Sequence, residues 1–193
     1  MTTNILLAGV GGQGIITAGQ VLAVAALKAG CDVKKSEVHG MSQRGGSVES
    51  HVRWSADQPV ASPLIGDGEA DFLVALEQLE ALRSVHQVRA GGAVLTATRR
   101  IPPLPVLTGV AQYPADAVEA LRARSRRVVA LDADAIAADV GNPRAANIVM
   151  LGALSRLVDL PVRAWEQAVV AAVPARGRES SLEAFRRGRD MTP

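Results

Sequence analysis

The sequence predicts an α/β fold: a three-layer α/β/α, Rossmann-like domain with a mostly parallel sheet and a helical C-terminal part. Two observations support this prediction. Short apolar runs of strand length alternate with segments of helical periodicity. A glycine-rich turn at residues 9–14 separates the first apolar run from the first helical segment. Because no linker or internal repeat divides the chain, we expect one domain over residues 1–193, helical from about residue 133.

The first part of the chain is typical of a βαβ unit. An apolar run at residues 4–10 suits a buried parallel strand, residues 15–29 have helical periodicity, and residues 31–38 supply a second strand. Residues 47–54 then alternate between apolar and polar side chains, with Glu49, His51 and Arg53 sharing one face. This alternation predicts a half-buried strand with a polar face.

Downstream segments continue the alternation of strands and helices. The proline-rich residues 101–105 are expected to be extended or irregular, because proline lacks an N–H and restricts the residue before it. A short basic helix or tail ends the chain at residues 181–189. Strands are expected at residues 71–76, 92–96 and 127–131, and helices at residues 81–88, 115–123, 133–140, 144–158 and 162–173.

Composition excludes several classes of protein. The net charge is +2, the basic residues are scattered, and only 3% of the residues are aromatic, so we expect no nucleic-acid partner. The apolar runs end before they reach membrane-spanning length, and the N-terminus lacks a signal-type segment, so we expect a cytoplasmic protein without a membrane anchor. Cys31 is the only cysteine, which excludes an internal disulfide and an iron–sulfur cluster built from this chain alone.

Gly9, Gly11 and Gly14 fit the G-x-G-x-x-G pattern between a strand and a helix. Backbone N–H groups in such a turn can hold a diphosphate at the helix N-terminus, and Glu37 stands near the end of the second strand, where a dinucleotide site has an acid. The same turn also serves tight strand–helix packing without a ligand, so both interpretations stay open. We expect a branched side chain at Gly11 to be strained, because the turn favours positive φ.

The segment from Glu37 to Ser47 is the most informative stretch of the chain. It combines a histidine, a glutamine, an arginine and three glycines, and it lacks the apolar periodicity of a core element. It indicates either a site or subunit contact, or a polar turn between two strands. Arg44 is the best candidate for binding an anionic group, because its guanidinium can make paired charge-assisted bonds. A metal site from His39, Glu49 and His51 is conceivable, but the spacing does not fix one and we expect none.

Gly66-Asp67-Gly68 is similar to the start of the thiamine-diphosphate motif, in which a pair of asparagines follows some thirty residues later. The corresponding window around residues 96–100 contains no asparagine. We therefore expect this chain not to bind thiamine diphosphate through that motif, and the three residues to form a turn.

Three blocks together resemble one family: the glycine turn, residues 34–48 with the His39–Ser47 run, and Asn142-Pro143-Arg144-Ala145-Ala146-Asn147. The chain is identified as a member of the gamma-type subunits or domains of the 2-oxoacid:ferredoxin oxidoreductases, and is most similar to the indolepyruvate type. The resemblance covers about residues 4–174. The His39–Ser47 block is specific to the family, whereas the glycine turn alone would be a weak sign.

The resemblance implies a small subunit that is inactive alone and works in an enzyme that converts an aryl- or indole-pyruvate-type 2-oxoacid into an acyl-CoA and reduces ferredoxin. It places thiamine diphosphate, Mg²⁺ and the iron–sulfur clusters on a larger partner subunit, with coenzyme A as co-substrate. It gives no secure catalytic residue here. The residues expected at the inter-subunit face near the cofactor are Gly11, Gly12, Gln13, Gly14, Glu37, His39, Met41, Ser42, Gln43 and Arg44. The alternatives are a stand-alone nucleotide-binding oxidoreductase and a non-catalytic interaction module.

Overall fold

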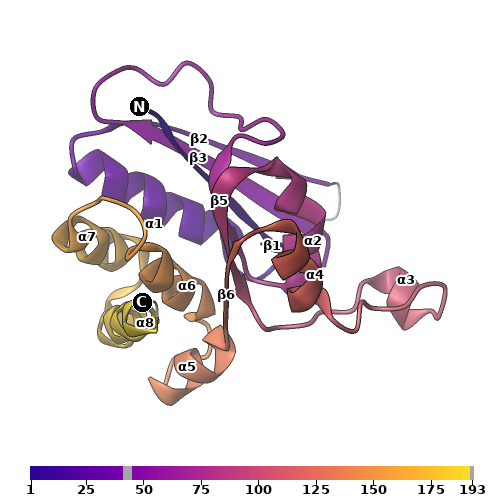
Figure 1. The fold of residues 1–193 in the computed structure, drawn as a ribbon. Coiled ribbons are helices and arrows are strands. Elements are labelled where there is room, and N and C mark those ends of the chain that lie inside the picture. Colours follow the sequence, from indigo (N-terminus) through magenta and orange to yellow (C-terminus); the bar gives the residue numbers. More distant parts are fainter. Residues whose placement is uncertain (41–44, 192–193) are drawn as a thin grey trace.

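A six-stranded sheet forms the centre of the computed structural model, which describes residues 1–40 and 45–191 (Figure 1). The strand order is β2-β3-β1-β4-β5-β6. β1, β4, β5 and β6 pair in parallel, whereas β3 is antiparallel to both of its neighbours, so that it alone runs against the others. The strands are β1 (Thr3–Val10), β2 (Asp32–His39), β3 (Ser47–Ser55), β4 (Ala70–Ala75), β5 (Val88–Ala97) and β6 (Arg127–Leu131).

Helices cover both faces of this sheet, which confirms the predicted three-layer α/β/α fold. One face carries α1 (Ile15–Lys28), α5 (Ala133–Asp139), α6 (Ala146–Leu154), α7 (Val162–Ala172) and α8 (Arg178–Asp190), which share a core with Ile5 and Leu7 of β1. The other face carries α2 (Gln78–Ser84) and α4 (Ala117–Arg124), which share a smaller core with Leu6 and Ala8. We call these the α1 face and the α2 face.

The predicted βαβ unit is present but split. β1, α1 and β2 follow one another as expected, yet β3 lies between β1 and β2. Ser50 is fully buried towards α1, as expected for the apolar face of β3, but the prediction that the opposite face is open to solvent is wrong at His51, which is only 4% exposed. A central strand is covered on both faces, so alternation in polarity here does not mean alternation in exposure.

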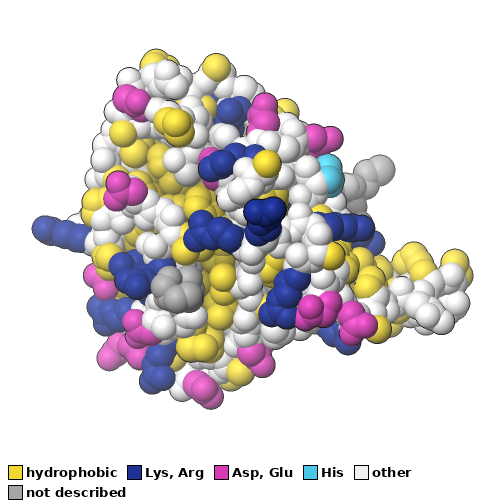
Figure 2. All heavy atoms as spheres, viewed as in Figure 1, with side chains coloured by type: hydrophobic (Ala, Val, Ile, Leu, Met, Phe, Trp, Pro, Cys, Tyr) yellow, Lys and Arg dark blue, Asp and Glu magenta, His cyan; other side chains and the backbone are white. Residues whose placement is uncertain are grey.

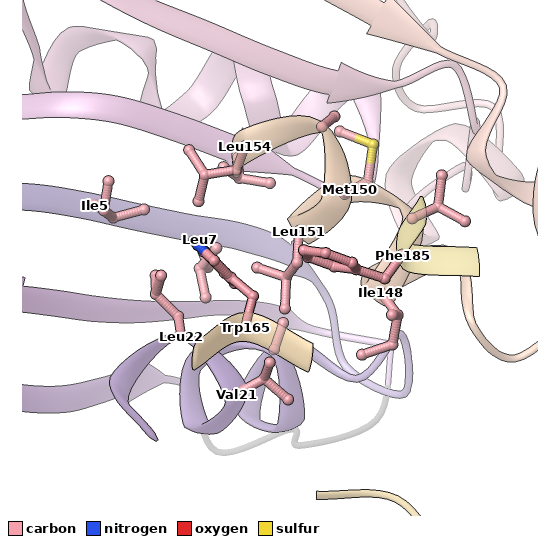
Figure 3. Close-up of a cluster of buried hydrophobic side chains, with 14 of the residues drawn as sticks. Ile5, Leu7, Val21, Leu22, Ile148, Met150, Leu151, Leu154, Trp165 and Phe185 are labelled. Carbon is pink, nitrogen blue, oxygen red and sulfur yellow. The ribbon is translucent and has the colours of Figure 1, made fainter. Parts of the chain in front are cut away.

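The C-terminal helices build most of the core on the α1 face. Trp165 and Phe185 are fully buried with ring centroids 6.0 Å apart, and they pack among Leu7, Leu22 and Leu151 (Figure 3). α6 is buried along nearly its whole length, which explains why its sequence has no polar face. This layer is therefore closed by large apolar side chains.

Several elements differ from the prediction in their bounds, and short helices appear that were not expected. α2 begins at Gln78 because the buried Glu77 side chain accepts a hydrogen bond from the Glu80 N–H at the start of the helix. The proline-rich segment contains a short helix, α3 (Leu104–Leu107), which begins directly after Pro103 and projects from the body of the molecule (Figure 1). Two 3₁₀ turns, η1 (Val85–Gln87) and η2 (Ala175–Gly177), extend α2 and precede α8.

Candidate functional site

The glycine turn lies where the sheet changes its winding direction. β1 leads into α1 on one face, and the neighbouring β4 leads into α2 on the other. Such divergence opens a crevice at the carboxyl ends of two parallel strands. Gln13 spans it, since its Oε1 accepts from the Val10 N–H at 2.8 Å and its Nε2 donates to the Leu76 carbonyl at 2.7 Å. Gln13 therefore holds the turn against the end of β4.

Gly14 fixes the start of α1 and its contact with α6. Its φ of +82° is in the left-handed region, and its carbonyl accepts from Asn147 Nδ2 at 3.1 Å. A Cβ at Gly14 would lie 2.6 Å from that nitrogen. Positive φ is found at Gly12 and Gly14 of this turn, so the expectation of backbone strain at Gly11 is wrong.

Gly11 instead extends the pairing of β1 with β3. Its N–H donates to the Gly46 carbonyl at 2.8 Å, and its carbonyl accepts from the Gly45 N–H at 3.2 Å. The three blocks that carry the family resemblance thus meet at the glycine turn, with Gly45 and Gly46 on one side and Asn147 on the other. Met41, Ser42, Gln43 and Arg44 lie outside the described residues.

Glu37 and His39 lie farther from this turn than a dinucleotide site requires. β3 separates β2 from β1, which places β2 two strand spacings, roughly 10 Å, from β1. The Glu37 carboxylate accepts from Lys35 Nζ at 2.6 Å, and the exposed His39 ring lies 3.0 Å from the Gly40 carbonyl. Glu37 therefore does not occupy the position of the ribose-binding acid, which belongs to the strand beside β1.

The conceivable metal site does not form. Ser36 is opposite His51 in the β2–β3 ladder, and His39 lies three residues beyond Ser36. Because directly opposite residues share a face and successive residues alternate, His39 is on the other face of the sheet from His51 and Glu49. Within residues 1–40 and 45–191, no three His, Cys, Asp or Glu side chains are grouped so that they could hold a metal ion.

A cleft of about 620 Å³ opens beside the glycine turn. Apolar side chains of Leu76, Ala97 and Ile148 line part of it. Residues at the N-termini of three helices also face it: Gly14 and Thr17 of α1, Ala146 and Asn147 of α6, and Gly177 and Ser181 of α8. Because the first N–H groups of a helix have no partner within it and carry a partial positive charge, the cleft suits an anion.

Arginines strengthen this positive potential, and Asp134, the one acidic residue among the described residues of the lining, offsets only one of them. Arg99, Arg144 and Arg176 line the cleft from three separate segments, and Arg99 is paired with Asp134 at 2.9 Å. Arg144 and Arg176 are exposed and form no ion pair within the part of the chain that the structure describes. These arginines were not among the sequence candidates. They are distant in sequence and scattered among many others, so only the fold brings them together.

Two ionisable groups on the α2 face have displaced pKa values. The neighbouring His51 lowers the pKa of Glu49 most, partial burial opposes this effect, and Ser84 and Gln87 lower it further through hydrogen bonds. Burial raises the pKa of Tyr113, and its hydrogen bond to Glu77 adds to the effect. Both groups lie outside the cleft, so neither is a candidate for proton transfer there.

The part of the chain that the structure describes contains no helix with both the length and the apolar character needed to cross a membrane.

Comparison with known proteins identifies relatives along nearly the whole chain. Residues 4–191 match the family described as pyruvate ferredoxin/flavodoxin oxidoreductase. The indolepyruvate oxidoreductase subunit IorB of Pyrococcus horikoshii is 38% identical over 187 residues, which cover 94% of this chain and 92% of the relative. The same subunit of Thermococcus kodakarensis is 38% identical over 190 residues, with 96% and 93% coverage.

A solved structure has the same fold. The gamma subunit of keto/oxoacid ferredoxin oxidoreductase from Geobacter sulfurreducens superposes with a TM-score of 0.73 at 28% sequence identity. The match covers 98% of this chain and 97% of that subunit. The similarity therefore includes the split βαβ unit and the C-terminal helices rather than the glycine turn alone.

Proposed function

This chain belongs to the pyruvate ferredoxin/flavodoxin oxidoreductase family as a small subunit, and we propose that it serves an indolepyruvate-type enzyme. In this proposal its arginine-lined cleft holds the anionic part of coenzyme A. The assembled enzyme would oxidise and decarboxylate an aryl- or indole-pyruvate, form an acyl-CoA and pass electrons to ferredoxin. The names of the 38% identical relatives support the indolepyruvate substrate. The cleft is lined by Gly12, Gln13 and Gly14 of the glycine turn, which the family resemblance implies is near the cofactor.

The convergence on one cleft of three helix N-termini and of two arginines that form no ion pair with any described residue is the observation that carries this proposal. Coenzyme A carries a diphosphate and a 3′-phosphate, which are strong acceptors for arginine and for free backbone N–H groups. The apolar lining from Leu76, Ala97 and Ile148 offers a surface for the less polar parts of the same molecule. The cleft thus matches a ligand that combines several negative charges with apolar segments.

The redox and thiamine cofactors belong to the larger partner subunit in this proposal. Cys31 is the only cysteine of the chain, whereas an iron–sulfur cluster needs several. Asp67 lies in a turn in which the Glu69 N–H donates to the Gly66 carbonyl, and its carboxylate faces His86 at 3.4 Å. The residues of this chain therefore do not fit thiamine diphosphate, its Mg²⁺ or a cluster, and no step of the reaction is assigned to them.

We extend the proposal to a second group of residues, Gly11–Gly14, Glu37, His39 and residues 41–44, which would contact the larger subunit near its cofactor. Gly45, directly after this segment, is hydrogen-bonded to Gly11 of the turn. Arg44 would bind the 2-oxoacid carboxylate or a coenzyme A phosphate, with Ser42 and Gln43 as neutral donors.

Reconstitution with the larger subunit tests the cleft. Arg144→Ala combined with Arg176→Ala should raise the KM for coenzyme A by roughly a hundredfold or more, because each lost charge-assisted bond contributes about 1.5–3 kcal/mol and the double variant loses two. The KM for indolepyruvate and the melting temperature should stay unchanged. Arg163→Ala on α7 is the matched control, since Arg163 is exposed and does not line the cleft.

Each alternative has its own outcome. An unchanged KM for coenzyme A in the double variant would contradict the proposed role of the cleft. A wild-type complex that is inactive on all arylpyruvates would contradict the proposed substrate class. For the second group of residues, the Arg44→Ala or Gln43→Ala variant should assemble normally and either raise the KM for the 2-oxoacid or coenzyme A or lower the turnover. If the complex instead dissociates while each intact complex keeps its activity, the segment serves only the interface. Tight binding of a dinucleotide by the isolated chain would favour the stand-alone oxidoreductase.

A further inference from the structure

The segment from Ile101 to Ala115 forms an arm that projects from the body of the molecule. It contains no charged side chain, although charged residues directly flank it at Arg100 and Asp116. Leu104 is 72% exposed, Leu107 is 71% exposed and Val110 is 82% exposed. Figure 1 shows α3 at the tip of the arm, and Figure 2 shows hydrophobic side chains gathered on the same projection. Exposed apolar side chains clustered in this way mark an interaction surface.

The tip of the arm is ordered by its own hydrogen bonds. The Leu107 N–H donates to the Pro103 carbonyl at 3.1 Å, and the Ala111 N–H donates to the Pro105 carbonyl at 2.9 Å. Thr108 closes the short helix by donating through its N–H to the Leu104 carbonyl at 2.9 Å. Prolines restrict the backbone further. A surface that is already ordered loses little conformational entropy when a partner covers it.

The stem of the arm is held by a buried carboxylate. Glu77 is fully buried, and its Oε1 accepts from the Ile101 N–H at 3.0 Å and from the Tyr113 hydroxyl. Arg100 donates to the Pro114 carbonyl at 2.6 Å, and its guanidinium lies 4.6 Å from the centre of the Tyr113 ring. Both ends of the arm are thus held next to the end of β4, so the arm keeps a defined direction.

The arm and the arginine-lined cleft lie at the same edge of the sheet, where the parallel strands have their carboxyl ends. Arg99, which lines the cleft, is two residues before Ile101, and both follow the carboxyl end of β5. Leu76 also lines the cleft, and the next residue, Glu77, holds the stem. A protein that covers this edge would therefore meet the cleft and the arm together.

The two clefts of this chain match an uncharged tip poorly, although apolar residues form part of the lining of both. The large cleft is also lined by Arg99, Arg144 and Arg176, and the second, on the α7–α8 side, by Lys28, Glu166 and Arg178. Burying Leu104 and Leu107 there would desolvate these charged groups without giving them a partner. In the part of the chain described, neither cleft offers a place for the arm of a second copy, which favours a different chain as the partner.

We infer that the arm inserts Leu104, Leu107 and Val110 into an uncharged apolar groove of the larger subunit, so that it docks this chain with its cleft towards the active site. This inference rests on the proposed function, because it takes its partner from the assembled oxidoreductase. It goes beyond that function by assigning the docking contact to residues outside the glycine turn and the His39–Ser47 segment.

Titration of the larger subunit with full-length variants tests the inference. Leu104→Gln combined with Leu107→Gln keeps helix propensity and should raise the Kd by roughly tenfold or more, as for apolar anchors at an interface. The melting temperature of the isolated variant should stay within about 2 °C of wild type, because both side chains are exposed. Leu27→Gln is the matched control, since Leu27 is 57% exposed in the last turn of α1, away from this edge.

The outcomes separate the arm from the function. If wild type binds the larger subunit and the double variant binds equally well, the arm inference is overturned and the proposed function stands. If wild type forms no complex, both fail. Sedimentation of the isolated wild-type chain should show a monomer. A dimer that the double variant abolishes would identify a second copy as the occupant and overturn the inference.

Discussion

The two faces of the central sheet are stabilised in different ways. On the α1 face, large apolar side chains fill the space, and helices α6 and α8 approach so closely that glycines are required where they meet. On the α2 face the apolar cluster is smaller, and the carboxylates of Glu49, Glu77 and Glu80 lie at or near it, with Glu77 fully buried and Glu80 only 3% exposed.

Each carboxylate of the α2 face joins segments that are distant in sequence. Glu80 accepts from the Ser47 hydroxyl at 2.5 Å, Glu49 accepts from the Ser84 hydroxyl at 2.9 Å, and Glu77 holds both ends of the arm. Burying a charge costs desolvation free energy, and hydrogen bonds of this kind offset that cost. The α1 face therefore contributes most of the burial that stabilises the fold, whereas the α2 face fixes the positions of β3, α2 and the arm.

The largest effect is expected where α6 crosses α8. A Cβ at Gly152 would lie 2.0 Å from the Phe185 carbonyl oxygen, and a Cβ at Gly188 would lie 2.0 Å from the Val149 carbonyl oxygen. Because backbone cannot move aside as a side chain does, Gly152→Ala and Gly188→Ala should each lower the free energy of unfolding by about 3 kcal/mol or more. Urea denaturation of the variants measures this loss.

Gly177→Ala is the control for the crossing. Gly177 precedes α8 with a φ of −110°, and a Cβ there would meet nothing within 4 Å. Its free energy of unfolding should stay within about 0.5 kcal/mol of wild type. Equal stability of all three variants would mean that α6 and α8 are not in backbone contact.

The next largest effect is expected at Glu77 on the α2 face. Glu77→Ala leaves the Glu80 and Ile101 N–H groups and the Tyr113 hydroxyl without their acceptor. Since a buried donor left without its acceptor costs about 1–3 kcal/mol, the variant should lose about 2–3 kcal/mol of stability in urea denaturation, and Tyr113→Phe about 1 kcal/mol. If Glu77→Ala matched wild type, the α2 face would depend on packing alone, as the α1 face does.

The order of elements was predictable from the sequence because its signals are local. Strand-length apolar runs, glycine stops and prolines mark where β1, α1 and β6 begin and end. The place of β3 between β1 and β2 was not predictable, because strand order depends on pairing between distant segments. For the same reason the alternation of polarity in β3 was identified correctly, but the burial of His51 was not.

The candidate site was predictable only in part. The glycine turn and the Asn142–Asn147 block were found through local patterns and resemblance, and the structure brings Gly14 and Asn147 into contact. Glu37 was placed beside the turn only on the assumption that β2 pairs with β1. Arg176 carries no local signal, and Arg144 was noted only as part of the Asn142–Asn147 block, because an arginine at a cleft and one on a solvated helix look alike in sequence.

The buried acceptor on the α2 face should also be visible in a pH titration. Tyr113 is the only tyrosine of the chain, so tyrosinate absorbance reports this residue alone. Burial raises its pKa above the ordinary value of 10.0, and Glu77 raises it further. The folded chain should therefore show no ionisation at pH 10, whereas the unfolded chain in denaturant should be about half ionised there.

The same shift sets a pH dependence of stability. The folded state holds the proton of Tyr113 more tightly than the unfolded state does. The contribution of Tyr113 to the free energy of unfolding is therefore fully present below pH 10 and is lost as the pH rises through the folded pKa. Tyr113→Phe should remove this loss at alkaline pH. A tyrosine that titrates near pH 10 in the folded chain would contradict the bond to Glu77.

The smallest effect distinguishes two buried serines, one from each face. Ser50 is fully buried towards α1, and its hydroxyl has no hydrogen-bond partner among the residues that the structure describes. Ser84 is 1% exposed on the α2 face and donates to Glu49 at 2.9 Å.

Ser84→Ala removes a bond to a charged group and should lower the free energy of unfolding by about 1 kcal/mol or slightly more. Ser50→Ala removes only an unpaired hydroxyl and should be neutral or slightly stabilising in the same urea titration. Since the two substitutions delete the same atom at equal burial, the difference between them measures how far each face depends on polar bonds. Equal losses for both serines would show that Ser50 has a partner, and the contrast between an apolar face and a hydrogen-bonded face would then be weaker than the geometry indicates.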